Sequence, residues 1–279
     1  MGSYIRPRAL DAALRARAAG PCTILAGGTD FYPARVGRTV GEDVLDITAL
    51  ADLRGVQERP AHFRIGALTT WTDLVESPLP AWFDALKLAA REVGGVQIQN
   101  TGTVAGNLCN ASPAADGVPP LLALGAEVEL QSVRGIRRLP LGEFVLGNRR
   151  TACSPDELVT AVLVPRWDSR ARSTFLKLGA RRYLVISIVM VAAVAELAGD
   201  GTIARAAVAV GACSAVAQRL ARLERELAGH RLAPGIGALV TAEHLVPLAP
   251  IGDVRGTAAY RLDAAATLVA RALERLADE

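Results

Sequence analysis

The chain has 279 residues, of which 51% are hydrophobic and 21% charged, a composition that excludes a disordered protein. Its 31 basic and 28 acidic residues give a formal net charge of +3, which by itself indicates no nucleic-acid partner. The longest apolar run, 183–195, is shorter than the roughly 20 residues that a membrane-spanning helix requires, so we expect no membrane span.

The first part of the chain is predicted to alternate short helices and strands. Apolar residues recur at helical spacing in some segments and form short runs bounded by glycine, proline or charged residues in others. The spacing predicts helices over 9–19, 70–76, 80–92 and 119–124, strands over 22–25 and 44–47, and hairpins that pair 55–57 with 63–65 and 127–131 with 137–140. Residues 146–155 are expected to be irregular, and 165–172 to be a charged linker around Trp167.

Beyond this linker the pattern changes to strands followed by helices, which is typical of a small α+β layer. Extended segments are expected over 174–178, 184–197 and 203–210, with a tight turn at 199–201, and helices over 215–228 and 262–277. Leu220, Leu223 and Leu227 fit helical spacing, so we expect the first of these helices to face the core.

Two segments rich in glycine and hydroxyl side chains, 26–30 and 100–116, are predicted to be ligand-binding loops. Glycine lets a backbone approach a ligand closely, and exposed N–H groups satisfy phosphate oxygens. A tight strand-to-helix turn is the alternative for either segment alone. Because two occur together, a diphosphate shared between them, and hence a dinucleotide, is favoured. Neither has the G-x-G-x-x-G spacing of a Rossmann loop or a Walker A lysine.

Four polar side chains are interpreted individually. Ser112, which precedes a proline, is expected to cap a turn or touch a ligand. The carboxylate of Asp30 is expected to accept from backbone N–H groups of its own loop, and Asp116 to cap a helix N-terminus. Lys177, within an apolar strand, is expected to face a partner because buried lysines are rarely unpaired.

The four cysteines form no C-x-x-C pair, which argues against zinc or an iron–sulfur cluster held by this chain. The N-terminal residues show no signal-peptide apolar region, so we expect a cytoplasmic protein with reduced thiols. The sequence contains no G-x-S-x-G motif and its three histidines lie in loop-like contexts. We therefore expect no catalytic residue and no metal site.

Several of these segments, in this order, resemble the flavoprotein (medium) subunit of molybdenum hydroxylases. This family includes carbon monoxide dehydrogenase, xanthine dehydrogenase and bacterial N-heterocycle hydroxylases. The resemblance covers nearly the whole chain and rests on AGGTD at 26–30, TVAGN at 103–107, NASP at 110–113, Asp116, PPLLALGA at 119–126, FLKL at 175–178, the arginine pair 181–182 and DVRG at 253–256.

The resemblance implies an α+β chain with a two-part FAD-binding domain of the vanillyl-alcohol-oxidase type, residues 1–170 (subdomains of about 1–54 and 55–170), followed by a smaller α+β domain, 171–279. It implies noncovalent FAD, because no histidine or cysteine lies in a loop that resembles a flavin attachment site. The residues expected to bind FAD are Leu25, Ala26, Gly27, Gly28, Thr29, Asp30, Val93, Thr103, Val104, Ala105, Gly106, Asn107, Asn110, Ser112, Asp116, Cys153, Lys177 and Ile186.

By resemblance, 26–30 and 103–107 flank the pyrophosphate, with the hydroxyls of Thr29 and Thr103 as donors. Three polar residues, Asn110, Ser112 and Asp116, would reach the ribityl and adenosine portions. Cys153 would lie near the adenine and Lys177 near the flavin, with Val93 and Ile186 close to the cofactor.

The chain departs from the family at Val185, where an acidic residue is common three positions after the arginine pair. Loss of that charge puts NAD in doubt as the electron acceptor and leaves a quinone, O2 or another acceptor open.

The resemblance implies an electron-transfer subunit that partners a molybdenum-cofactor large subunit and a 2Fe–2S small subunit, so that molybdopterin and the iron–sulfur clusters sit on those chains. Two alternatives stay open: a stand-alone FAD oxidoreductase on the same fold, and a scaffold subunit that has lost FAD. The substrate oxidised at the molybdenum site cannot be deduced from this chain.

Overall fold

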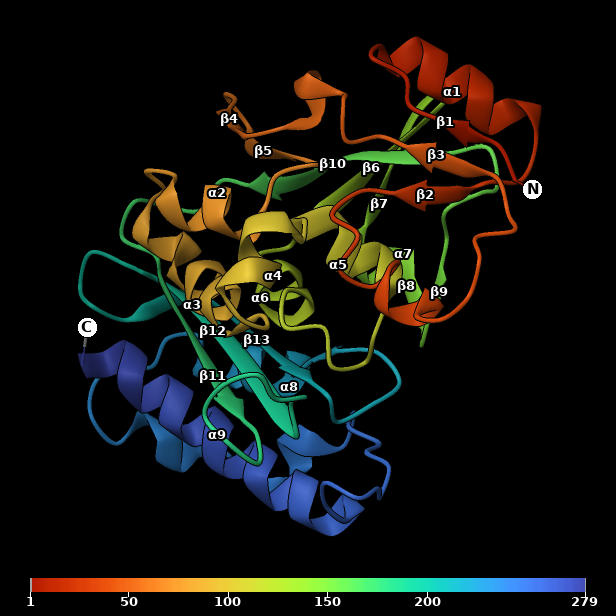
Figure 1. The fold of residues 1–279 in the computed structure, drawn as a ribbon. Helices are drawn as coiled ribbons and strands as arrows, with labels where there is room; N and C mark the ends of the chain where they lie inside the picture. The colour runs from red at the N-terminus through yellow and green to blue at the C-terminus, as the bar shows by residue number, and fades with distance from the viewer. Residues whose placement is uncertain (1, 279) are drawn as a thin grey trace. The chain divides into compact units, whose positions relative to one another are not determined.

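Figure 1 shows the computed structural model, which describes residues 2–278. The chain forms two compact units, each assembled from segments that are distant in the sequence. The second unit begins its last segment at residue 166, near the boundary expected at residue 170, but it also includes two earlier segments. Unit 1 comprises residues 2–77, 96–111 and 126–165, and unit 2 comprises 78–95, 112–125 and 166–278.

Unit 1 contains a small parallel sheet and a larger antiparallel sheet. Helix α1 (Leu10–Ala19) connects the two outer strands of the parallel sheet, which both pair with the central strand, because strands that run in the same direction need a crossover rather than a hairpin. The parallel sheet has the order β1 (Tyr4–Ile5), β3 (Val44–Asp46), β2 (Thr23–Leu25). The antiparallel sheet has the order β4 (Val56–Glu58), β5 (His62–Gly66), β10 (Leu158–Pro165), β6 (Glu127–Ser132), β7 (Gly135–Pro140). Both predicted hairpins are therefore present.

Short helices and turns complete unit 1. They are η1 (Pro33–Arg35), η2 (Ala51–Leu53), α2 (Trp71–Glu76), α4 (Val96–Thr101), α5 (Val104–Asn110) and α7 (Leu141–Phe144). The prediction that 100–116 is wholly a loop is wrong, because α5 occupies its centre. The prediction that 146–155 is irregular is also partly wrong, since β8 (Val145–Gly147) and β9 (Arg150–Thr151) pair there.

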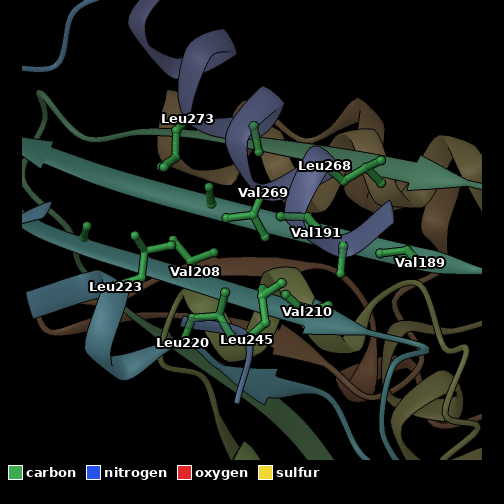
Figure 2. Close-up of a cluster of buried hydrophobic side chains, with 14 of the residues drawn as sticks. Val189, Val191, Val208, Val210, Leu220, Leu223, Leu245, Leu268, Val269 and Leu273 are labelled. Carbon is green, nitrogen blue, oxygen red and sulfur yellow. The ribbon is translucent and has the colours of Figure 1, made fainter. Parts of the chain in front are cut away.

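Unit 2 is built on an antiparallel sheet whose central strands are buried on both faces. Its order is β11 (Arg172–Leu178), β12 (Val189–Leu197), β13 (Ile203–Gly211), β14 (Gln218–Arg219). Figure 2 shows one face, where side chains of β12 and β13 meet those of α8 (Ala221–Leu227) and α9 (Ala258–Asp278).

Helices from earlier in the chain contact the same strands of unit 2. Helix α3 (Asp84–Glu92), preceded by η3 (Ala81–Phe83), contacts β11, and α6 (Val118–Ala123) contacts β12 and β13. Close packing here requires Gly211, because a Cβ at that position would lie 2.6 Å from Met190 Cε and 2.7 Å from Pro119 Cγ. The α+β layer is therefore thicker than the strands-then-helices pattern predicts. Two short helices, η4 (Ile236–Leu239) and η5 (Ala242–Leu245), complete it.

Two boundaries predicted in unit 2 are wrong. The strand expected over 184–197 begins only at Val189, because Leu184 has a positive φ of 51° and its carbonyl accepts from the Arg181 guanidinium. The helix expected over 215–228 is limited to α8, because residues 218–219 pair with β13 instead. Its core face is predicted correctly, since Leu220, Leu223 and Leu227 are fully buried.

The expected linker 165–172 contains neither helix nor strand between β10 and β11, but it is anchored. Trp167 is buried, and its indole Nε1–H donates to the Leu124 carbonyl oxygen at 3.1 Å. The guanidinium carbon of Arg205 lies 3.6 Å from the centre of its ring. None of the helices within residues 2–278 combines the length and apolar character needed to cross a membrane.

Candidate functional site

The two predicted ligand-binding segments lie against each other in unit 1. Strand β2 ends at Leu25 and delivers the loop 26–30, while α4 ends at Thr101. A Cβ at Gly27 would lie 2.1 Å from the Thr101 carbonyl oxygen and 2.8 Å from Gly102 Cα. No side chain fits at a distance of 2.1 Å, so only glycine allows these two backbones to approach. Two segments about 70 positions apart in the sequence therefore form one surface of small residues.

Gly28 takes a backbone conformation that favours glycine. Its φ is +74°, and a Cβ there would lie 2.7 Å from Cε2 of Tyr32. A side chain at this position would therefore be strained and would displace the Tyr32 ring. Such turns point successive backbone N–H groups toward one side, where they can donate hydrogen bonds to an anionic ligand.

The second segment is fixed by its contacts with the chain around α2. Thr103 forms an isolated antiparallel bridge with Thr70, and the Val104 N–H donates to the Thr69 carbonyl oxygen at 3.0 Å. Thr103 Oγ1 accepts from the Gly106 N–H at 3.0 Å and so caps α5. Because a hydroxyl that accepts one hydrogen bond can still donate its proton, Thr103 retains a donor for a ligand.

A chain of polar side chains links the two segments. The Asn110 Nδ2 donates to Asp30 Oδ1 at 3.2 Å, and Arg149 Nη1 donates to Asn110 Oδ1 at 2.9 Å. The expectation that Asp30 accepts from backbone N–H groups is therefore corrected: the contact found joins it to an amide side chain across the site. The Arg149 N–H also donates to the Ala111 carbonyl oxygen at 3.0 Å.

Arg149 is a member of this cluster that the sequence analysis missed. It lies in the turn between β8 and β9 with a φ of +54°, an uncommon conformation for a residue other than glycine. The only feature of the sequence that could have indicated a role for Arg149 is that it forms a basic pair with Arg150.

Cys153, also in unit 1, is partly buried. Its Sγ lies 3.6 Å from the Glu157 carbonyl oxygen, and burial raises the pKa of its thiol to about 11. The side chain is therefore a neutral thiol at physiological pH. Its expected place beside the adenine stays a prediction.

In unit 2, Asp116 and Lys177 form a buried ion pair. Lys177 Nζ lies 2.8 Å from Asp116 Oδ2, and the side chains are 5% and 10% exposed respectively. The Ser187 hydroxyl donates to Asp116 Oδ1 at 2.8 Å, and Lys177 also donates to the Glu92 carbonyl oxygen at 3.2 Å. The partner expected for Lys177 is thus found. Burial raises the pKa of Asp116 despite the nearby ammonium group.

The interpretation of Asp116 as a helix cap is wrong, because the N-cap of α6 is Gly117 and no side chain caps it. Ser112 does cap a turn, since its Oγ accepts from the Ala114 N–H at 3.2 Å. Val93 follows α3 as its C-cap residue, and Ile186 is 54% exposed in the segment before β12. The FAD contacts expected of these unit 2 residues stay predictions.

Two sequence families match consecutive parts of the chain. One is described as "FAD binding domain in molybdopterin dehydrogenase" and matches residues 1–167. The other is described as "CO dehydrogenase flavoprotein C-terminal domain" and matches residues 174–276.

Individual relatives agree with these matches. The nicotinate dehydrogenase FAD-subunit of Eubacterium barkeri is 40% identical over 174 residues, which cover 61% of this chain and 59% of that protein, less than two thirds of it. The glyceraldehyde dehydrogenase medium chain of Sulfolobus acidocaldarius is 30% identical over 99% of this chain and 98% of its own. A solved structure of carbon monoxide dehydrogenase from Hydrogenophaga pseudoflava matches with a TM-score of 0.88 at 26% identity, covering 98% of this chain and 96% of that one.

Proposed function

The chain belongs to the family of FAD-binding medium subunits of molybdenum hydroxylases, and from this premise we propose that it transfers electrons from a partner 2Fe–2S subunit to an external acceptor. In the proposed complex, a large subunit carries the molybdenum cofactor and oxidises the substrate. This chain supplies the FAD site of that oxidoreductase.

The observation that carries the proposal is the close approach of the two glycine segments in unit 1. A Cβ at Gly27 would lie 2.1 Å from the Thr101 carbonyl oxygen, which is too close for any side chain. A Cβ at Gly28 would lie 2.7 Å from Tyr32 Cε2. The result is a surface of backbone beside Thr29 in the first segment and the buried Thr103 in the second. This donor set, N–H groups and hydroxyls without a nearby cluster of carboxylates, fits a diphosphate. The one acidic residue there, Asp30, is occupied by Asn110.

FAD, when bound, supplies the ability to accept electrons singly and release them in pairs. The proposed task of the chain is to bind and orient that group. Residues 26–30 and 103–107 hold the diphosphate, and the contacts among Asp30, Asn110 and Arg149 keep the two segments in register. We propose that no side chain of this subunit acts as a general acid or base.

The first experiment measures flavin binding by the full-length chain and two matched variants. Gly28→Ala and Gly37→Ala place a Cβ at nearly the same positive φ, +74° and +73°, but only the first meets a neighbouring side chain. We expect about one noncovalent FAD per wild-type chain, released completely by acid precipitation, and unchanged flavin content in Gly37→Ala. Gly28→Ala should lose flavin. Equal flavin content in both variants would contradict the site assignment.

The second experiment tests the electron-transfer role. The chain is co-expressed with the 2Fe–2S and molybdenum-cofactor subunits proposed as its partners, and the complex is isolated by size exclusion. Addition of the molybdenum-site substrate should bleach the flavin absorbance of the complex but not that of the isolated chain. Turnover of a reducing substrate by the isolated chain at enzymatic rates would instead identify a stand-alone oxidoreductase. Absence of any flavin after FAD addition would identify a scaffold subunit.

A further inference from the structure

An exposed aromatic ring lies directly beside the glycine loop of unit 1. The Tyr32 N–H donates to the Gly28 carbonyl oxygen at 3.1 Å, which turns the chain back onto the loop. Its ring then covers the position of a Gly28 Cβ, with Cε2 at 2.7 Å and Cδ2 at 2.9 Å. Tyr32 is nevertheless 63% exposed, so most of its ring surface faces solvent.

The surrounding contacts hold this ring in place. Phe31 meets Tyr32 edge to face, with ring centres 5.2 Å apart. The Arg35 guanidinium carbon lies 3.9 Å from the centre of the Phe31 ring, and its Nη1 donates to the Phe31 carbonyl oxygen at 2.9 Å. Arg35 also forms an ion pair with Glu42. Phe31, Arg35 and Glu42 therefore form a connected set of contacts beside Tyr32.

We propose that Tyr32 forms an aromatic wall of the FAD site and stacks on a flat ring system of the dinucleotide beside the diphosphate. This inference rests on the function proposed above, because it places the diphosphate against Gly27 and Gly28. A large exposed aromatic side chain that touches the loop lies within reach of a group attached to that diphosphate. Both ring systems of FAD, adenine and isoalloxazine, offer the π face with which aromatic side chains stack.

The experiment titrates FAD, ADP and FMN into the flavin-free full-length chain and three variants. Tyr32→Ala removes the ring, Tyr32→Phe keeps the ring and removes the hydroxyl, and Val36→Ala changes an exposed side chain of the same segment. Circular dichroism checks that each variant folds. We expect Tyr32→Ala to bind FAD about 5- to 150-fold more weakly, the loss of one stacked base. Tyr32→Phe and Val36→Ala should bind FAD as the wild type does.

The two smaller probes identify which ring is stacked. Weakened ADP binding by Tyr32→Ala with unchanged FMN binding assigns the adenine, and the reverse assigns the isoalloxazine. FAD binding by Tyr32→Ala equal to that of Val36→Ala would overturn the inference. So would an equal loss in Tyr32→Phe, which would show that the hydroxyl and not the ring acts. A wild-type chain that binds no FAD would instead contradict the proposed function itself, so the two failures are distinct.

Discussion

The two units use glycine and polar side chains in opposite ways. In unit 1, Gly27 lets two backbones meet, and the strand leading to it, β2, has only three residues. In unit 2, Gly211 makes room for the side chains of Met190 and Pro119, within strands of nine residues. The binding that we propose for unit 1 therefore depends on exposed backbone, whereas glycine in unit 2 serves side-chain packing.

The polar groups follow the same division. The Asn110 side chain in unit 1 joins Asp30 to Arg149 at a partly open surface. The Asp116 carboxylate in unit 2 is enclosed and neutralised by Lys177. We therefore expect substitutions in unit 1 to change flavin binding first, and substitutions in unit 2 to change the free energy of unfolding first.

The largest effect is expected at the backbone contact of unit 1. Gly27→Val should leave the purified protein with almost no flavin, because a branched side chain cannot stand 2.1 Å from the Thr101 carbonyl oxygen without driving the segments apart. Flavin-to-protein absorbance ratios measure this. Gly41→Val is the matched control, since a Cβ there meets nothing within 4 Å. Full flavin content in Gly27→Val would show that flavin binding does not depend on this backbone contact.

A large loss of stability is expected on breaking the ion pair of unit 2. Lys177→Met leaves the Asp116 carboxylate buried without its cation, which typically costs about 3–5 kcal/mol of unfolding free energy. Urea unfolding measures this. The double variant Asp116→Leu/Lys177→Met should be less destabilised than Lys177→Met alone, because it removes both charges. If the double variant were less stable than Lys177→Met, this account of the ion pair would be contradicted.

The pH dependence of that loss has a definite sign. Burial already raises the folded-state pKa of Asp116 above its ordinary value, and removal of Lys177 raises it further. The folded state then binds a proton that the unfolded state releases, so stability falls as the pH rises from the ordinary carboxyl pKa toward the raised one. Relative to the wild type, Lys177→Met should therefore lose more stability at about pH 8 than at about pH 5.

A core substitution should separate stability from binding. Leu223, fully buried on α8, packs against β13, so Leu223→Ala should cost about 2–5 kcal/mol of unfolding free energy. Below the unfolding transition the variant should keep its flavin. The exposed neighbour Arg225→Ala should stay within about 0.5 kcal/mol of the wild type. Loss of flavin from folded Leu223→Ala would contradict the division between the units.

The smallest effect is expected within the polar chain of unit 1. Asn110→Ala removes the contacts at 3.2 Å to Asp30 and at 2.9 Å to Arg149, without opening the backbone contact. One such net interaction is worth about 1 kcal/mol, which corresponds to roughly fivefold weaker FAD binding. Fluorescence quenching on titration with FAD measures it. A loss as complete as that of Gly27→Val would show that the side chains, not the backbone, carry the site.

Much of the fold could be predicted, because it depends on local patterns. The two hairpins of unit 1 and the buried face of α8 follow from alternation and helical spacing. The family resemblance, the fold class and the identity of an FAD-binding oxidoreductase subunit are confirmed by the two family matches. Several spaced motifs in a fixed order carried that resemblance, which a single glycine loop could not.

What the sequence missed depends on contacts between distant residues. Residues 218–219 lie within the helix predicted over 215–228, but they pair with β13 and form a strand instead. Helix α5 contains glycine and asparagine, which disfavour helices, and it forms with Thr103 as its cap. Arg149 joins the candidate site only because the β8–β9 turn brings it to Asn110.

The central claim is that both glycine segments of unit 1 bind the FAD diphosphate. The most direct measurement is a crystal structure of the chain soaked or co-purified with FAD. The account predicts the diphosphate in contact with both segments, 26–30 and 103–107, with hydrogen bonds from backbone N–H groups of 27–29. A diphosphate bound elsewhere on the chain, with these two segments facing solvent, would contradict it.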